Sequence, residues 1–413
     1  MNTKQFVFRA VALGLFSLVV TFAKAQSLEK YYEKLQEFEG QYQTYYDSKQ
    51  YDLAIQPLTD LIHFLDTTTV FNSSQYDESR EQINQSLASY KANTYYNLAC
   101  SYSLTHQKKA AIAALENAID LGYKDYANMK NDSDFDFIRN EKRFKALLKQ
   151  IEQYDNLSVL KNAASYSHED TDSLPRFVYQ SADDDCLRHV REFFSLDEVA
   201  GDGDEVSKIL NILRFAHDSI RHDGSNYALC EFDAIDLYNY HKSTGKGVNC
   251  RHLAIALNEM YLSMGFRSRY VTCMPKDPND QDCHVINTVW SSQLKKWIWV
   301  DPTFYAYVTD ENSNLLGINE VREHLIDGRP LVLNDDANWN HKSKQTKEYY
   351  LENYMAKNLY YIECVIESRF NPESRYRNTG SKYVKLVPSD EENESNDWIT
   401  FTHDADYFWQ APE

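Results

Sequence analysis

The chain has 413 residues, of which 43% are hydrophobic and 14% aromatic, and its formal net charge is -19. A chain of this length and apolar content can form packed cores and corresponds to two or three domains. The acidic excess argues against nucleic acid and anionic membrane surfaces as partners, because both carry charge of the same sign.

The first 25 residues have the three-part layout of a secretory signal peptide. Lys4 and Arg9 precede an apolar stretch, residues 10–22, and Ala23-Lys24-Ala25 matches a small-residue cleavage site. We therefore expect a mature chain beginning at Gln26 and an exported protein, periplasmic or extracellular. An uncleaved anchor is the alternative, but the apolar stretch is short for a bilayer span of about 20 residues, so we expect no transmembrane domain.

Residues 26–160 are expected to form an all-α domain that resembles tetratricopeptide repeats. Small and aromatic residues recur at the spacing of a closely packed helix hairpin, namely Tyr95, Leu98, Ala99, Tyr102, Ala111, Leu115 and Ala118. A partial second copy surrounds Ala54, but Ala54 and Ala111 are 57 residues apart, whereas about 34 is usual, so an insertion or a divergent helix lies between them. The resemblance implies a protein partner; a generic helical bundle that supports the second domain is the alternative.

Residues 161–174 are rich in Ser, Ala and Asp and are the expected linker to a second domain, residues 175–413. Near its end, residues 347–369 begin as a Tyr-rich helical pattern. Residues 383–388 and 398–403 are expected to be strands, either in the main sheet or in a small appended one.

Cys250 lies where a turn gives way to a helical pattern. The sequence Gly245-Lys246-Gly247-Val248-Asn249 precedes it, and apolar residues follow at helical spacing as far as Phe266. Backbone N–H groups at a helix N-terminus are unpaired and the helix dipole is positive there, so this position favours a thiolate.

His284 and Asp301 lie on strands that follow this helix. One strand is expected at residues 267–274, a second at 283–290 with His284 near its start, and a third at 297–301, which ends at Asp301 because a proline follows. Neighbouring strands are only about 5 Å apart, so His284 and Asp301 can touch, and a helix packed on the sheet can bring Cys250 to them.

The segments GKGVNCRHLAIALNEMYLSMGFRSRYV, DCHVINTVW and KKWIWVDPTF resemble the transglutaminase-like superfamily. The resemblance implies a papain-like α+β domain with an antiparallel sheet. It also implies a catalytic Cys-His-Asp set at Cys250, His284 and Asp301, which are 34 and then 17 residues apart. We therefore expect a cysteine enzyme, a peptidase or an acyltransferase, that acts on peptide or protein amide bonds through a thioester. A catalytically inactive protein- or peptide-binding module with the same fold is the alternative.

The oxyanion donor and the other histidines are less well defined by the sequence. The family places a side chain upstream of the cysteine, and Asn226 is one candidate, alongside the Cys250 backbone N–H. His252 is two residues after Cys250 and so faces away from it on a helix. The other histidines that we considered are His241, His324 and His341, which lack the strand context.

The seven cysteines leave one unpaired after any complete pairing, and Cys250 is the natural free thiol. Cys273 and Cys283 flank a turn between two strands and are expected to face each other. No spacing resembles a CxxC zinc site, so we predict no metal and no cofactor.

Overall fold

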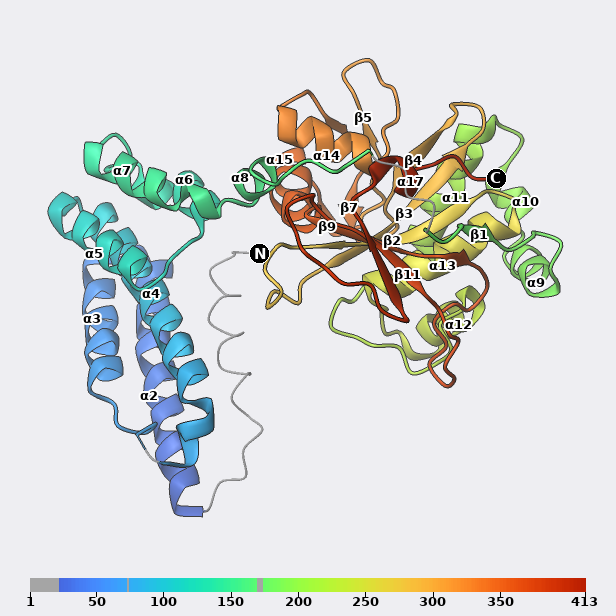
Figure 1. The fold of residues 1–413 in the computed structure, drawn as a ribbon. Helices are drawn as coiled ribbons and strands as arrows, with labels where there is room; N and C mark the ends of the chain where they lie inside the picture. The colour runs from blue at the N-terminus through green and yellow to red at the C-terminus, as the bar shows by residue number, and fades with distance from the viewer. Residues whose placement is uncertain (1–21, 73, 169–173) are drawn as a thin grey trace. The chain divides into compact units, whose positions relative to one another are not determined.

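The computed structural model describes residues 22–72, 74–168 and 174–413. The expected signal peptide lies outside these residues except for 22–25. The chain divides into two compact units, Met1–Asp155 and Asn156–Glu413, so the boundary falls ahead of the linker expected at 161–174. We describe each unit by itself (Figure 1).

The first unit is helical, as expected. Its helices are α2 (Phe22–Asp47), α3 (Tyr51–Thr67), α4 (Arg80–Leu104), α5 (Lys108–Asp120), α6 (Tyr126–Asn131) and α7 (Lys142–Ile151), with short 3-10 helices at Ser74–Ser79, Ser133–Phe135 and Glu152–Tyr154. Helices α2 to α5 pack in sequence, each on the next. Buried alanines at their contacts, among them Ala54, Ala99 and Ala111, let the helices approach closely.

The turns α2–α3 and α4–α5 have the same backbone geometry. In each, a residue with positive φ (Lys49, 59°; His106, 60°) precedes a glutamine whose N–H donates over 2.8 Å to the carbonyl of a tyrosine in the preceding helix. Ala54 and Ala111 occupy the first turn of the following helix and are fully buried. The two helix pairs thus share the geometry of their turns, and the 25-residue helix α4 contributes to the 57-residue offset between them.

The second unit is built on a six-stranded sheet in the order β12-β11-β9-β2-β3-β4, in which only β11 and β12 are parallel. Its strands are β2 (Ser268–Met274), β3 (His284–Ser291), β4 (Lys296–Val300), β9 (Tyr361–Val365), β11 (Tyr383–Leu386) and β12 (Ile399–Thr402). Three two-stranded pairs join β1 (Val178–Tyr179) to β10 (Glu367–Ser368), β5 (Val308–Thr309) to β6 (Val332–Leu333), and β7 (Asn338–Trp339) to β8 (Ser343–Lys344). The α+β class predicted from the sequence is confirmed.

The second unit also contains helices. They are α8 (Asn156–Lys161), α9 (Asp185–Phe193), α10 (Leu196–Ala200), α11 (Glu205–Ser219), α12 (Ala234–Thr244), α13 (Cys250–Ser263), α14 (Ile318–Asp327), α15 (Lys347–Tyr349), a π-helical turn (Tyr350–Met355), α16 (Ala356–Asn358) and α17 (Ala405–Phe408). Helix α13 packs on β2 and β3, and α9, α11 and α12 pack on α13 (Figure 1). Every residue of α13 from His252 to Ser263 is buried, so this helix is the centre of the unit.

Two expectations for the C-terminal segment change. Residues 347–369 begin as helix, but they then form β9, whose Ile362 and Cys364 are buried in the sheet. The tyrosine-rich helical pattern ahead of β9 concealed this strand. The open question about the last two strands is also answered, since β11 and β12 belong to the main sheet beside β9.

The expectation that Cys273 and Cys283 face each other is wrong. The β2–β3 register places Cys273 opposite His284. Cys283 lies one residue before β3, so it is not the residue opposite Cys273. All seven cysteines lie among the described residues and all are free thiols.

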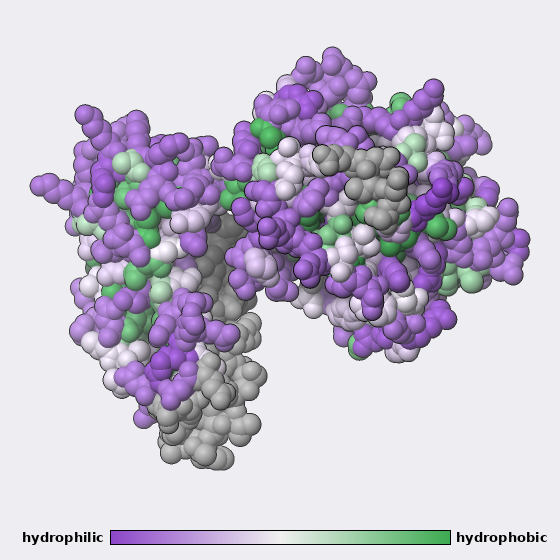
Figure 2. Space-filling model, in the orientation of Figure 1, coloured by the Kyte–Doolittle hydropathy of each residue, from purple (hydrophilic) through white to green (hydrophobic). Residues whose placement is uncertain are grey.

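None of the helices in the described parts of the chain is both long and apolar enough to cross a membrane. Figure 2 shows hydrophilic residues over most of the visible surface of each unit. This distribution agrees with an acidic chain whose apolar residues are gathered in internal cores.

Candidate active site

Cys250 is the first residue of α13, at the end of a tightly held turn. Asn249 caps the helix, its side chain accepting from the His252 N–H over 3.0 Å. The turn is bonded to the chain after α11, since Val248 N–H donates to Arg221 O over 2.9 Å. Gly247 is required there, because a Cβ would lie 2.7 Å from Arg221 O. The thiol is thereby held at the helix N-terminus.

His284 and Asp301 are hydrogen-bonded to each other at one end of the neighbouring strands β3 and β4. His284 begins β3, Asp301 follows β4, and His284 Nε2 lies 2.7 Å from Asp301 Oδ2 with both side chains buried. Since β4 pairs antiparallel with β3, Val300 opposite Asn287, the next position places Asp301 on the face that carries His284. Nε2 is occupied by the carboxylate, so Nδ1 is the imidazole nitrogen available to Cys250.

Tyr350 is a further partner of the carboxylate that the sequence analysis did not identify. Its hydroxyl donates to Asp301 Oδ2 over 2.6 Å, and Thr303 N–H donates to Oδ1 over 2.8 Å. Both carboxylate oxygens are therefore bonded, which holds Asp301 in one orientation. The only sequence signal for Tyr350 was the tyrosine-rich helix, in which neighbouring tyrosines are indistinguishable.

The electrostatics of this group favour an ion pair between thiolate and imidazolium. Burial alone would raise the pKa of Cys250, but hydrogen bonds from His222 and His284 outweigh it and lower the pKa to about 6. Burial alone would lower the pKa of His284, but the charge and hydrogen bond of Asp301, with Cys250, raise it to about 10. Burial would likewise raise the pKa of Asp301, and the charge of His284 lowers it.

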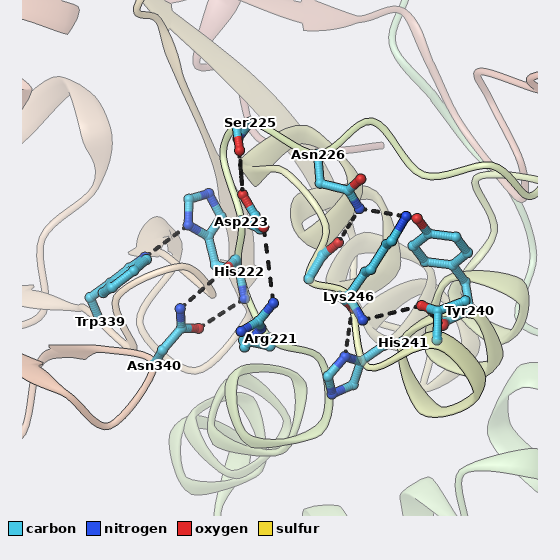
Figure 3. A network of polar contacts seen from close by, with 12 residues as sticks. Arg221, His222, Asp223, Ser225, Asn226, Tyr240, His241, Lys246, Trp339 and Asn340 are labelled. Carbon is cyan, nitrogen blue, oxygen red and sulfur yellow. Dashed lines mark hydrogen bonds and ion pairs between the residues drawn. The ribbon is translucent and has the colours of Figure 1, made fainter. Parts of the chain in front are cut away.

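His222 is a second histidine beside Cys250 that the sequence analysis missed. Its Nδ1 accepts from Trp339 Nε1 over 2.9 Å, so its proton resides on Nε2 (Figure 3). Asn340 fixes the backbone of His222 from both sides, accepting from its N–H over 2.8 Å and donating to its carbonyl over 2.9 Å. Trp339 and Asn340 are far from His222 in sequence, so only the fold brings this group together.

Asn226 lies near the same turn, but its amide is used in another way. Its Nδ2 donates to Gly247 O over 2.6 Å and to the Tyr240 hydroxyl over 3.2 Å (Figure 3). Asn226 thus braces the turn ahead of Cys250, whereas His222 is the upstream side chain that bonds to the thiol.

The other histidines considered from the sequence have separate surroundings. His252 is buried against Phe232, and burial lowers its pKa to about 4. His241 and His324 each bond through Nδ1 to a backbone carbonyl, that of Lys246 and that of Pro330. His341 Nε2 lies 3.2 Å from Asp218.

Among the described residues, two groups bring three atoms that could bind a metal within 4.8 Å of one another. One is His217, Asp218 and His341 in the second unit, and the other is Cys100, Asp132 and Asp134 in the first. Neither includes Cys250, His284 or Asp301.

Comparison with known proteins agrees with this geometry. The family model described as the transglutaminase-like superfamily matches residues 195–302, a range that contains α11, α13, β2 to β4 and the residues Cys250, His284 and Asp301. Residues 195–302 are therefore a transglutaminase-like superfamily domain.

One curated relative shares a shorter stretch with the chain. A chloroplastic protein from Arabidopsis thaliana is 41% identical over 58 residues, which are 14% of this chain and 17% of that protein. The match thus spans only about a sixth of the length of that relative. No solved structure matches the chain.

Proposed function

We propose that the chain is a cysteine enzyme that cleaves or transfers peptide or protein acyl groups through a thioester on Cys250. The observation that carries the proposal is the series of contacts from buried Asp301 through buried His284 to Cys250, with the thiol pKa lowered to about 6. A thiol with this pKa is mostly thiolate at neutral pH, which is the nucleophilic form.

In the first step the Cys250 sulfur attacks the carbonyl carbon of a carboxamide or peptide bond. The carbonyl π electrons move to oxygen and form a tetrahedral oxyanion. As the oxyanion collapses, the C–N bond breaks and the imidazolium of His284 gives its Nδ1 proton to the leaving nitrogen. Asp301 holds the ring and stabilises its charge while the proton is present, and Tyr350 and Thr303 hold Asp301.

His222 is the side chain best placed to stabilise the oxyanion. Because Trp339 occupies Nδ1, the Nε2–H group is directed toward the Cys250 side, where the reacting carbonyl would lie. The Cys250 backbone N–H, unpaired at the start of α13, is a second donor. In this proposal His222 takes the role that the sequence analysis considered for Asn226.

In the second step the thioester is resolved. His284, now neutral, accepts a proton from water or from an amine, the new C–O or C–N bond forms, and the C–S bond breaks to restore the thiolate. Water gives hydrolysis and an amine gives acyl transfer or cross-linking, so the acceptor determines which product forms.

Trapping the acyl group on Cys250 tests the proposal. The full chain would be mixed with a proteolytic digest of a glutamine-rich protein, quenched in acid and mapped by mass spectrometry. We expect a hydroxylamine-sensitive acyl adduct on Cys250, none on the more exposed Cys186, and none in a Cys250→Ala chain. Repeating the reaction with a labelled amine separates acyl transfer from hydrolysis. Adducts on Cys186 at equal yield, or no change in any peptide, would instead favour the binding module.

We further propose that the protein is exported and that the helical unit contacts a protein partner. The support is the signal-peptide layout of residues 1–25 and the repeated hairpins around Ala54 and Ala111. N-terminal sequencing of the protein from its native source should return Gln26, and a chain that still begins at Met1 would contradict export.

A further inference from the structure

A buried histidine outside the proposed triad faces a second acceptor atom. His217, in α11, is 5% exposed; its Nδ1 lies 2.9 Å from Pro302 O and its Nε2 lies 3.2 Å from Asn338 Oδ1. A carbonyl oxygen can only accept, so Nδ1 carries the proton. In a neutral imidazole Nε2 then presents a lone pair.

The orientation of the Asn338 amide is fixed by its other bonds. Its Nδ2 donates to Asp336 O over 2.9 Å, and its Oδ1 accepts from the His341 N–H over 2.6 Å. Oδ1 is therefore the atom turned toward His217. A lone pair of His217 Nε2 therefore faces a lone pair of Asn338 Oδ1 across 3.2 Å. This contact is stable only if a proton or a cation interacts with both atoms.

Two further donor atoms lie next to this pair. Asp218 Oδ1 is 3.2 Å from His341 Nε2, and the ligand atoms of His217, Asp218 and His341 all lie within 4.8 Å of one another. Neighbouring ligands of an ion bound at about 2.1 Å are roughly 3 to 3.4 Å apart, which both 3.2 Å separations match. The side chains of Asp218 and His341 are about half exposed, so an ion can reach them from solvent.

We propose that His217, Asp218 and His341 bind a divalent transition-metal ion of the zinc class, with Asn338 Oδ1 as a fourth donor. Two imidazole nitrogens and a carboxylate oxygen suit this class of ion. The hydrogen bond from His217 Nδ1 to Pro302 O is the kind of outer contact that orients a metal-binding histidine.

The bound ion stabilises two sides of the candidate active site. It joins the end of α11 to the β7–β8 hairpin, and that hairpin carries Trp339 and Asn340, which hold His222. Through His217 it also supports Pro302, the residue after Asp301. The ligands come from residues 217–218 and 338–341, so no short sequence spacing indicated the site.

Cobalt titration of the full chain tests the site. The chain would carry Cys250→Ala, which prevents binding at the thiol. We expect one Co²⁺ per chain with ligand-field absorption but without the charge-transfer band of a thiolate ligand. One equivalent of Zn²⁺ should displace it, and either ion should raise the midpoint of thermal unfolding. Asp218→Asn and His341→Asn, both at exposed positions, should each weaken binding by more than about 100-fold, beyond the effect of changing an outer contact.

His168→Asn is the matched control, because His168 is an exposed histidine paired with Asp406 at 2.9 Å. It should leave Co²⁺ affinity unchanged. The proposal is overturned if binding is not stoichiometric, if a thiolate band appears, or if both ligand variants bind as the parent does.

Discussion

In the helical unit, buried and partly buried tyrosines donate to carboxylates, whereas in the α+β unit a buried imidazole lies beside a partly buried thiol and lowers its pKa. The Tyr96 hydroxyl donates to Asp132 over 2.9 Å, and that of Tyr46 to Asp134 over 2.6 Å. Burial and the nearby Cys100 raise the pKa of Tyr96, so the hydroxyl stays neutral. For Cys250, burial has the same sign, but two histidines outweigh it.

The difference shows that burial alone does not activate a polar group. A buried acid becomes ionised only where a cationic or donating partner is fixed beside it. In the helical unit the partners of the tyrosines are acids, which oppose ionisation, so those contacts are structural. In the α+β unit the partner of the thiol is a histidine whose pKa Asp301 raises.

The largest expected effect is that of removing the thiol. Cys250→Ala should abolish acyl transfer, by at least about 10⁵-fold in kcat/KM, because no other group forms the thioester. The fold should survive, since a small side chain replaces a small one at a helix start; circular dichroism and the thermal midpoint check this. A kcat/KM for Cys250→Ala within about tenfold of the parent value would contradict the proposed mechanism.

His284→Ala should be nearly as severe, about 10⁴-fold, because it removes both the partner of the thiolate and the proton donor. Steady-state kinetics on the trapped substrate measures it. The double variant Cys250→Ala with His284→Ala should be no worse than Cys250→Ala alone, as expected of residues that act as a unit. An additive loss would mean that the two residues act separately.

Asp301→Asn should reduce kcat by about 10²- to 10³-fold, less than His284→Ala, because the imidazole remains but loses the charge that keeps it protonated. The pH-rate profile is the discriminating measurement. Its alkaline limb, which reports the loss of the His284 proton, should move to lower pH, since Asp301 is what raises that pKa. If the alkaline limb stays at the same pH in Asp301→Asn, Asp301 has only a packing role.

Tyr350→Phe should have a smaller effect, about tenfold in kcat with little change in KM. It removes one hydrogen bond to Asp301, for which about 1 to 1.5 kcal/mol is typical. Tyr349→Phe is the matched control. The neighbouring Tyr349 is 57% exposed, so this substitution should leave kcat unchanged. Equal effects in both variants would contradict the positioning role.

The smallest effect should come from the helical unit. Ala111→Leu adds volume at a fully buried helix contact and should destabilise that unit by about 1 to 3 kcal/mol. The rate at which Cys250 is alkylated should stay within about twofold, because the helical unit supplies no group to the triad. A large change in that rate would show that the helical unit completes the site.

Local patterns predicted most of the elements around the site. The turn before Cys250, the apolar helix after it and the strands carrying His284 and Asp301 follow from glycine positions and helix or strand spacing. The helical class of the first unit followed in the same way. Strand β9 was not predicted, because only Leu359 and Tyr360 separate it from the tyrosine-rich helical segment, and neither residue type indicates a turn.

The groups that complete the site could not be predicted, because they are brought together only by tertiary structure. Trp339 reaches His222, and Tyr350 reaches Asp301, across long stretches of sequence. The Cys273 expectation failed for a related reason. A register shift of one residue exchanges the two faces of a strand, and the turn at 275–282 does not define that register.

The reactivity of Cys250 as a function of pH tests the central claim most directly. Iodoacetamide alkylation of the full chain would be followed by peptide mapping between pH 4.5 and 10. The rate at Cys250 should rise with a midpoint near pH 6, since the thiolate forms above its pKa. Cys186 is an internal control, because partial burial and the charges of Asp184 and Asp185 raise its pKa above the ordinary value.

At pH 7, Cys250 should therefore be alkylated much faster than Cys186, although Cys186 is the more exposed thiol. In His284→Ala the midpoint for Cys250 should move to higher pH, because a partner that lowers the pKa is lost. A midpoint for Cys250 at or above that of Cys186 in the parent chain would contradict an activated thiol and with it the proposed enzyme.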